Sequence, residues 1–308
     1  MNARMKGSLR IGRVLGVDVF VHWSWALVAF IEIQTRHNAY STQAWNVAEY
    51  LALFLVVFLH EMGHALACRS VGGRADTILL WPLGGVAYVQ PPPRPGALLW
   101  SIIAGPLVNL ALLAVLTPPV ILSGMLGLPP DAHHFVVALW AINLVLFGFN
   151  MLPVYPLDGG QFAQALLWFV IGRARSLQVV SVIGIVAGAV GAVVAVARGS
   201  LWYVVMAAFV VMRALGGMRQ ARVLAQAAAA PRRAGYFCPQ CGAAPPVGPF
   251  WVCPCKARFD TFEAGGRCPS CARAFPATSC VDCNKLSPLD AFRRETPPMP
   301  GGGLPGSC

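Results

Sequence analysis

The chain has 308 residues, of which 57% are hydrophobic and only 11% are charged, and its mean hydropathy is +0.63. Soluble globular domains carry about 25% charged residues, so this composition excludes an ordinary soluble protein and indicates a membrane protein. The formal net charge is +11. Basic loops that face anionic lipid account for such a charge, so it does not require a nucleic acid partner.

Six apolar segments are long enough, or nearly so, to cross about 30 Å of hydrocarbon. They lie near residues 17–34, 47–68, 98–120, 135–153, 177–197 and 200–214, the last being the shortest. The first run has no small-residue cleavage site after it, which favours a membrane anchor over a cleaved signal peptide. We therefore expect an all-α polytopic membrane protein with about six transmembrane helices.

Basic residues are distributed unevenly between the connections. The N-terminal segment and the loops 69–97 and 172–176 carry several arginine or lysine residues, whereas the alternate connections carry at most one. Positively charged loops remain in the cytoplasm. This pattern predicts a multi-pass protein of the cell membrane with both termini in the cytoplasm.

Residues 55–66 read LVVFLHEMGHAL and place three costly side chains in an apolar span. A charged group at the bilayer centre costs about 2.5–3.5 kcal/mol on insertion scales, so such residues are usually functional. His60 and His64 are spaced i and i+4 on one helix face and can hold one metal ion, with Glu61 beside them. Zinc hydrolases arrange two ligands and a general base in this way. A purely structural interpretation leaves all three groups without a task.

Two histidines leave a zinc ion without its third protein ligand, and the segment NMLPVYPLDGG at 150–160 offers one. Pro153 and Pro156 interrupt the fourth span, and Asp158 follows at the break. Taken alone, Asp158 is better explained as a solvated turn residue. However, the second and fourth spans both run toward the cytoplasm in the predicted topology. Asp158 and the two histidines are therefore expected at the same depth.

These two motifs resemble those of a known family. HEMGH at 60–64 and NMLPVYPLDGG at 150–160 are similar to the HExxH and N-x-x-P-x-x-P-x-D-G motifs of the site-2 protease family of intramembrane zinc metalloproteases, especially its compact bacterial branch. The resemblance covers roughly residues 15–215. It implies a zinc ion bound by His60, His64 and Asp158. It also implies that Glu61 activates water and that Asn150 binds substrate or the developing oxyanion.

Two further segments are similar to features of the same family. LLWPLGGVAYV at 79–89 resembles a membrane-dipping hairpin, and its Gly84, Gly85 and Val86 match the Gly-Gly segment. Strand-forming residues around the glycines favour an edge that binds unwound substrate by strand addition over a simple loop turn. AGPLVN at 104–109 is similar to a third-span motif. For Asn109 a hydrogen bond between helices is the preferred interpretation.

Residues 236–292 contain eight of the ten cysteines, in four close pairs. The pairs are Cys238 and Cys241, Cys253 and Cys255, Cys268 and Cys271, and Cys280 and Cys283. Such pairs are typical of structural four-cysteine zinc sites, and a reducing cytoplasm disfavours disulfides. Two sites are expected, in a tandem zinc-ribbon-like domain. We expect sequential pairing, the first two pairs on one ion and the last two on another, although the sequence leaves interleaving open.

The predicted organisation is a membrane-embedded metalloprotease domain at 1–214, a linker at 215–235, the zinc-ribbon-like domain at 236–292 and a disordered tail at 293–308. The predicted function is cleavage of transmembrane or membrane-associated proteins near the cytoplasmic side, with a cytoplasmic protein as partner of the cysteine-rich domain. The alternative is a catalytically silent membrane scaffold, which has no use for the intact Glu61. A metal transporter is disfavoured because the third, fifth and sixth spans carry no acidic or histidine residue.

Overall fold

The computed structural model describes residues 7–35, 39–81 and 84–293. Its contacts divide the chain into two compact units. The first comprises Met1–Pro91 and Gly96–Leu166, and the second comprises Pro92–Pro95 and Leu167–Cys308. The first unit contains a sheet and the helices that carry the HEMGH motif, and the second contains two long helices and the cysteine-rich region.

A four-stranded sheet lies in the first unit. Its strands are β1 (Ser8–Val14), β2 (Val17–His22), β3 (Arg74–Trp81) and β4 (Gly84–Gln90), and they follow this order across the sheet. The β2–β3 pair is parallel and the other two pairs are antiparallel. The predicted hairpin is therefore present as β3 and β4, with its turn at residues 82–83 outside the described part of the chain. The two N-terminal strands were not predicted.

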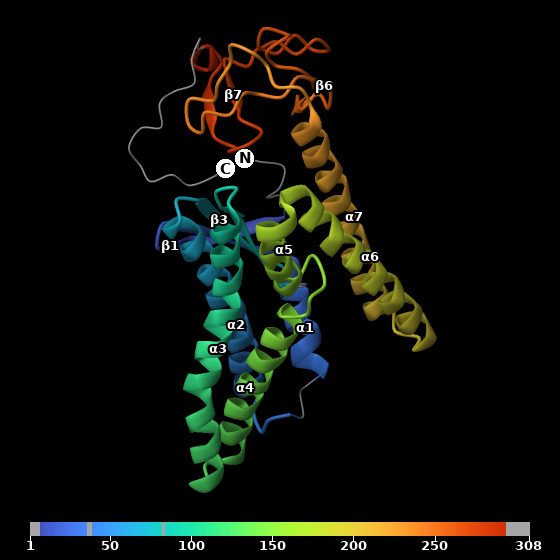
Figure 1. The fold of residues 1–308 in the computed structure, drawn as a ribbon. Coiled ribbons are helices and arrows are strands. Elements are labelled where there is room, and N and C mark those ends of the chain that lie inside the picture. The colour runs from blue at the N-terminus through green and yellow to red at the C-terminus, as the bar shows by residue number, and fades with distance from the viewer. Residues whose placement is uncertain (1–6, 36–38, 82–83, 294–308) are drawn as a thin grey trace. The chain divides into compact units, whose positions relative to one another are not determined.

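The long helices of the first unit are α2 (Gln43–Ser70), α3 (Pro95–Met125) and α4 (Pro130–Asn150), which lie side by side in Figure 1. Gly63 lets α2 approach α3 closely, because a Cβ at this position would lie 2.8 Å from the carbonyl oxygen of Ala104. The C-terminal half of α2 packs on the sheet through a buried apolar cluster that includes Ala65, Ile78 and Leu80. This packing fixes the HEMGH turn relative to the strands.

The expected first transmembrane helix at 17–34 is corrected by the structure. Residues 17–22 form β2, and the helix that follows, α1 (Ser24–Thr35), has 12 residues and a length of about 18 Å. The sequence VDVFVH alternates β-branched and polar or aromatic residues, and its Val17 and Val19 are buried against the helices. A strand and a short helix therefore lead the chain from the sheet toward the start of α2. The carbonyl oxygen of Trp25 on α1 accepts a hydrogen bond from the hydroxyl of Tyr50 on α2, and the two rings meet edge to face.

The second unit contains α6 (Arg173–Ala197) and α7 (Leu201–Ala229), which pack against each other as an antiparallel pair (Figure 1). Gly188 allows this contact, because a Cβ there would lie 2.7 Å from a methyl group of Val211. The predicted boundary at residue 214 is not a boundary in the structure. α7 continues to Ala229 because residues 218–229 are mostly alanine, leucine, arginine and glutamine, which are good helix formers.

The predicted linker also folds as part of its neighbours. The backbone N–H of Arg233 donates to the carbonyl oxygen of Pro245, and the N–H of Val247 donates to that of Pro231. Ion pairs from Arg232 to Asp282 and from Arg233 to Asp260, at 2.7 and 2.5 Å, bind the same segment to the cysteine-rich region. The last helix and this region are thus joined through Ala230 without a long flexible connection.

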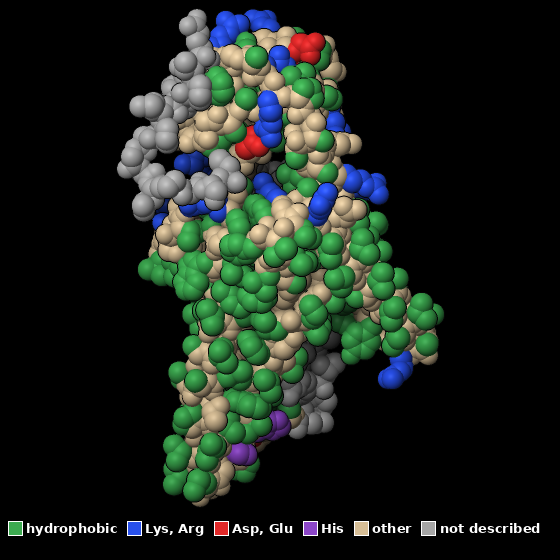
Figure 2. Space-filling view, in the orientation of Figure 1, with side chains coloured by type: hydrophobic (Ala, Val, Ile, Leu, Met, Phe, Trp, Pro, Cys, Tyr) green, Lys and Arg blue, Asp and Glu red, His purple; other side chains and the backbone are tan. Residues whose placement is uncertain are grey.

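Within the described residues, five helices are long and apolar enough to cross a membrane. They are α2, α3, α4, α6 and α7. The two shorter α-helices are α1 and α5 (Asp158–Ile171), with 12 and 14 residues. Figure 2 shows hydrophobic side chains over much of the surface of the long helices, as contact with lipid requires. The predicted polytopic membrane fold is confirmed, with the strand and short helix described above in place of a sixth long helix.

Candidate metal centre and cysteine clusters

Three potential metal ligands from two helices converge inside the first unit. The Nε2 atoms of His60 and His64 are 3.1 Å apart. Oδ2 of Asp158 lies 3.0 Å from Nε2 of His60 and 3.2 Å from Nε2 of His64. Ligand atoms of a tetrahedral site with bonds of about 2.0 Å lie about 3.3 Å apart. The three atoms therefore fit three corners of one tetrahedral metal site, which leaves a fourth position for water or substrate.

The break after α4 places the aspartate. α4 ends at Asn150, the loop 151–157 turns back, and Asp158 begins α5. A Cβ on Gly159 would lie 2.4 Å from the carbonyl oxygen of Leu152, and a Cβ on Gly160 would lie 2.4 Å from the backbone nitrogen of Tyr155. Only glycine fits between this loop and the first turn of α5. The two glycines after the aspartate thus allow the loop to bring Asp158 to the histidines.

Gly105 on α3 forms the wall opposite the histidines. A Cβ at this position would lie 2.3 Å from Nε2 of His64 and 2.9 Å from Cε1 of His60. A side chain there would occupy the space beside the converging ligand atoms. The glycine of the AGPLVN segment therefore leaves room for the imidazoles and for an ion between them.

Glu61 lies beside the three ligands and contacts the sheet. Its Oε2 accepts a hydrogen bond of 2.8 Å from the backbone N–H of Ala87 on β4. A Cβ on Gly85 would lie 2.5 Å from Oε1 of Glu61, so this glycine provides the space for the carboxylate. Gly85, which belongs to the predicted segment 84–86, is thereby linked directly to the site.

A model of peptidase family M50 matches residues 48–127 and 119–195 of the chain. A zinc metalloprotease of Methanocaldococcus jannaschii is 32% identical over 182 residues, which are 58% of this chain and 51% of that protein. Rip3 of Mycobacterium tuberculosis is 31% identical over 220 residues, 64% of this chain and 55% of that protein. The solved site-2 protease of M. jannaschii has 27% identity and a TM-score of 0.51, and the alignment covers 69% of this chain and 95% of that structure.

The chain belongs to peptidase family M50, the site-2 protease family. It spans about half the length of the two curated relatives above. The matched region contains HEMGH, AGPLVN and the segment with Asp158. The family resemblance noted from these motifs is thereby confirmed.

Hydrogen bonds on the far side of each imidazole orient the histidines of this M50 protein. Nδ1 of His60 lies 2.5 Å from Oδ1 of Asn109, whose Nδ2 donates to Oδ1 of Asn143 at 2.7 Å. Nδ2 of Asn143 in turn donates to the backbone oxygen of Asn109 at 2.9 Å. Nδ1 of His64 lies 2.8 Å from the carbonyl oxygen of Ser101. Both acceptors select the tautomer with a proton on Nδ1, so each Nε2 presents its lone pair to the ion.

Asn109 therefore has two roles, only one of which was predicted. It joins α3 to α4 through Asn143, as expected, and it also orients His60. Both asparagines are fully buried. The involvement of Asn143 and Ser101 was not predicted. The available signal for Asn143 was its polar amide in an otherwise apolar span. Ser101 acts through its backbone and therefore leaves no signal in the sequence.

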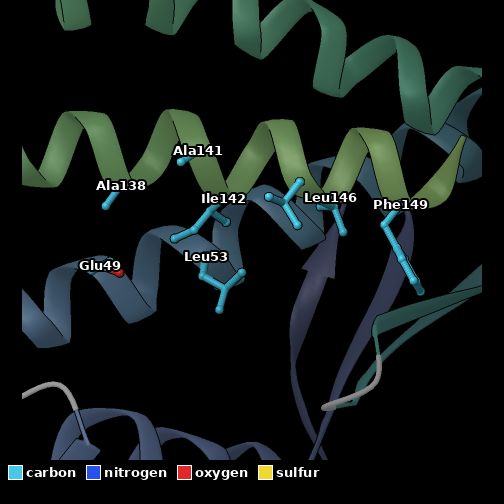
Figure 3. A pocket seen from close by; sticks show the side chains of 8 residues that line it. Glu49, Leu53, Ala138, Ala141, Ile142, Leu146 and Phe149 are labelled. Atoms are coloured by element: carbon cyan, nitrogen blue, oxygen red, sulfur yellow. The ribbon is translucent and has the colours of Figure 1, made fainter. Parts of the chain in front are cut away.

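Asn150 is half-buried and is the last residue of α4, at the edge of the loop that carries Asp158. Near this residue ends a groove of about 490 Å³ between α2 and α4 (Figure 3). Its lining consists of Glu49, Leu53, Ala138, Ala141, Ile142, Val145, Leu146 and Phe149. No pattern in the sequence predicted this groove. Its single acidic residue, Glu49, accepts a hydrogen bond of 2.5 Å from the hydroxyl of Tyr40.

The eight cysteines of the second unit form two clusters that match two four-sulfur metal sites. Cys238, Cys241, Cys280 and Cys283 form one cluster, and Cys253, Cys255, Cys268 and Cys271 form the other. Within the clusters, the Sγ atoms of Cys238 and Cys283, Cys241 and Cys280, Cys253 and Cys271, and Cys255 and Cys268 are separated by 3.5 to 3.9 Å. Tetrahedral zinc with bonds of about 2.3 Å to sulfur places its ligands about 3.8 Å apart. The expected sequential pairing is wrong, because the second cluster is nested inside the first.

Each cysteine pair adopts the same turn, which explains why the short Cys253-Pro-Cys255 pair takes part. The residue after the second cysteine has a positive φ in all four turns, and its N–H donates to the carbonyl oxygen of the first cysteine. These residues are Gly242, Lys256, Ala272 and Asn284. The N–H of the first cysteine donates to the carbonyl oxygen of the residue that follows the positive-φ residue. A short strand pair, Trp251–Val252 with Arg258–Phe259, flanks the Cys253 turn, and cysteines of both clusters pack with Trp251, Phe259 and Phe262 in one buried core.

Thiolate character is favoured at one cysteine of each cluster. A side-chain hydrogen bond with Cys241 lowers the pKa of Cys280 to about 6. The backbone N–H of Ala257 lowers the pKa of Cys255 to about 6. Thiolates are the metal-binding form of cysteine, so these contacts prepare both clusters for a cation.

The asparagine network predicts an effect on metal affinity. Asn109→Ala removes the acceptor that orients His60, and such changes weaken metal binding about 10-fold to 100-fold. Asn46→Ala, which removes another buried asparagine from the same unit, is the matched control and should leave the affinity unchanged. Metal content after equilibration with graded chelator, counted apart from the cysteine-bound metal, measures both. Equal retention in the two variants would contradict the positioning role of Asn109.

The positive φ angles predict the stability of the cysteine turns. Ala272 has a φ of 57°, and Ala272→Gly should stabilise the metal-loaded region by about 1 kcal/mol because glycine adopts this conformation without strain. Gly242→Ala should destabilise it by a similar amount, since Gly242 has a φ of 73°. The temperature at which the full chain releases its cysteine-bound metal checks both, and shifts of the same sign would refute the explanation.

Proposed function

We propose that this M50 protein is a zinc-dependent intramembrane endopeptidase that cleaves transmembrane or membrane-associated proteins near the cytoplasmic side. The observation that carries the proposal is the triangle of His60, His64 and Asp158, with Glu61 beside it, inside an apolar bundle. The similar M. jannaschii protein is named a zinc metalloprotease, which supports zinc as the ion and peptide hydrolysis as the reaction.

In this proposal His60, His64 and Asp158 hold the zinc ion. Bound zinc supplies Lewis acidity, which polarises the scissile carbonyl and lowers the pKa of water to about 7. Glu61 accepts the proton of the attacking water and returns it to the leaving amine. Asn150, at the end of α4, donates its amide to the developing oxyanion. The buried position of Glu61 and the histidines excludes bulk water, which strengthens each of these interactions.

The substrate is proposed to bind as an extra strand. A transmembrane helix satisfies its backbone hydrogen bonds internally, so its peptide bonds are protected until the segment unwinds. Within the described residues, β4 is one edge of the sheet, and Ala87 on this edge contacts Glu61. An unwound segment that pairs with β4 recovers backbone hydrogen bonds and lies next to the base. Gly84, Gly85 and Val86 belong to this substrate surface in the proposal.

The cysteine-rich region is proposed to bind two structural zinc ions and to recruit or gate substrates at the cytoplasmic side through contact with a protein partner. Its direct connection to α7 through Ala230 supports the proposal, because a partner bound to this region also restrains the helix. Deletion of residues 236–308 is expected to change which substrates are cut or how fast. An unchanged substrate set and rate would contradict this role.

The general-base assignment predicts that Glu61→Gln retains zinc but abolishes cleavage of a membrane substrate, since glutamine occupies the same space and cannot accept the water proton. Quantitative proteomics of cells with wild type or Glu61→Gln then identifies the membrane proteins that accumulate uncut. A silent scaffold predicts identical profiles. Full activity of Glu61→Gln would also remove the base assignment.

The ligand assignment predicts that Asp158→Ala lowers the zinc content by one equivalent per chain. Asp131→Ala is the matched control. Asp131 lies at the start of α4 and accepts a hydrogen bond from the backbone N–H of Ser41, so its removal should leave the zinc content unchanged. Zinc is measured by elemental analysis of the full chain, with the cysteine-bound ions counted separately. Unchanged stoichiometry in Asp158→Ala would exclude this ligand.

A further inference from the structure

The N–H group of Ala87 points away from the sheet. Ala87 lies opposite Ile78 in the β3–β4 ladder, yet its N–H donates to Oε2 of Glu61 at 2.8 Å. Successive residues of an antiparallel strand direct their N–H and C=O groups to opposite sides. The register shift between Ala75 and Ile78 adds its extra residue on β3, so the alternation along β4 continues. Gly85, Ala87 and Val89 therefore all present their backbone groups to the outer edge of β4, with Ala87 in the middle.

The outer edge of β4 and the resting position of Glu61 thus depend on the same donor. An N–H group makes one good hydrogen bond. A substrate strand that pairs with this edge needs the N–H of Ala87 for one of its carbonyl oxygens. Pairing through the full length of β4 is incompatible with the present contact between Ala87 and Glu61.

Displacement of Glu61 from Ala87 leaves a buried carboxylate that needs a new donor. Only 7% of Glu61 is exposed, and leaving a buried charged acceptor without a partner costs more than a typical hydrogen bond. Glu61 lies on α2 next to His60 and three residues before His64, so its displaced carboxylate stays close to the three ligands. A water molecule at the open corner of the triangle can supply the donor. Gly85, which has no Cβ, leaves the carboxylate room to move.

We propose that the N–H of Ala87 is exchanged between Glu61 and the substrate: pairing of the substrate with β4 displaces Glu61 and releases it to act on water. The base is therefore held by the strand until a substrate is aligned beside it. This inference rests on the proposed strand addition. It adds that the two steps, binding and activation of the base, share one hydrogen-bond donor.

A binding experiment tests the competition directly. The probe is a fluorescein-labelled hexapeptide of alternating valine and threonine, titrated into the zinc-loaded full chain in detergent. Glu61→Ala removes the competing acceptor, so we expect about fivefold tighter binding than for wild type, as for one hydrogen bond. Glu61→Gln keeps a carbonyl oxygen at the same place and should remain close to wild type. Equal affinity of wild type and Glu61→Ala overturns the inference.

A pair of proline variants separates the inference from the proposed function. Ala87→Pro and Val89→Pro each remove one outward N–H without breaking the ladder to β3, because proline is tolerated where the N–H faces away from the sheet. Both should raise KM for a membrane substrate several-fold. Only Ala87→Pro should raise the turnover of an N-acylated dipeptide amide, which is too short to pair with β4, because Glu61 is then released without a substrate strand.

The outcomes are distinguishable. A lower turnover of the dipeptide amide in Ala87→Pro, at full zinc content, means that Ala87 positions Glu61 during catalysis and overturns the exchange. Unchanged KM in both proline variants means that substrates do not pair with β4, which defeats strand addition itself. If Ala87→Pro does not fold, as judged by its zinc content and thermal unfolding, the peptide titration decides alone.

Discussion

The structure depends on bringing ligands from separate elements to one point inside an apolar bundle. His60 and His64 come from one helix and need only helical spacing. Asp158 comes from an element that begins after α4 has ended, so its position depends on how the chain is interrupted. The proposed metal centre rests on the convergence of the three side chains within 3.2 Å. Every further proposal about water, base and substrate relies on it.

Glycines allow this convergence because they have no side chain to occupy the space beside the ligands and the loop. Gly105 leaves space beside the imidazoles, Gly85 leaves space for Glu61, and Gly159 admits the loop that positions the aspartate. In each case a Cβ would lie 2.5 Å or less from a neighbouring atom. Gly85 and Gly105 thus leave room for side chains of the candidate site, whereas Gly159 leaves room for loop backbone. This explains in physical terms why the motifs combine polar ligands with glycine.

The sequence predicted those features of the site that follow from local rules. The i, i+4 spacing predicted a shared face for the histidines, and two prolines predicted the end of the fourth helix before Asp158. Partners that depend on tertiary packing were not predicted. Asn143 and the backbone of Ser101 lie far from the histidines in sequence. No local pattern specifies that Asn143 bonds the asparagine beside His60 or that the carbonyl of Ser101 meets His64. β2 was missed because the apolar run 17–34 was interpreted by hydropathy alone and not by its alternation, and β1 lies in the basic segment before that run.

The cysteine-rich region shows the same limit. Close cysteine pairs predicted metal sites, and the repeated turn geometry shows why all four pairs are equivalent locally. Their pairing is a property of the tertiary structure, in which both clusters share one aromatic core, so local spacing carries no information about it.

The central claim concerns the site formed by His60, His64 and Asp158. Anomalous diffraction at the zinc edge from crystals of the full chain tests it most directly: the account predicts a peak about 2 Å from Nε2 of both His60 and His64 and from the Asp158 carboxylate. Peaks confined to the cysteine clusters would contradict it.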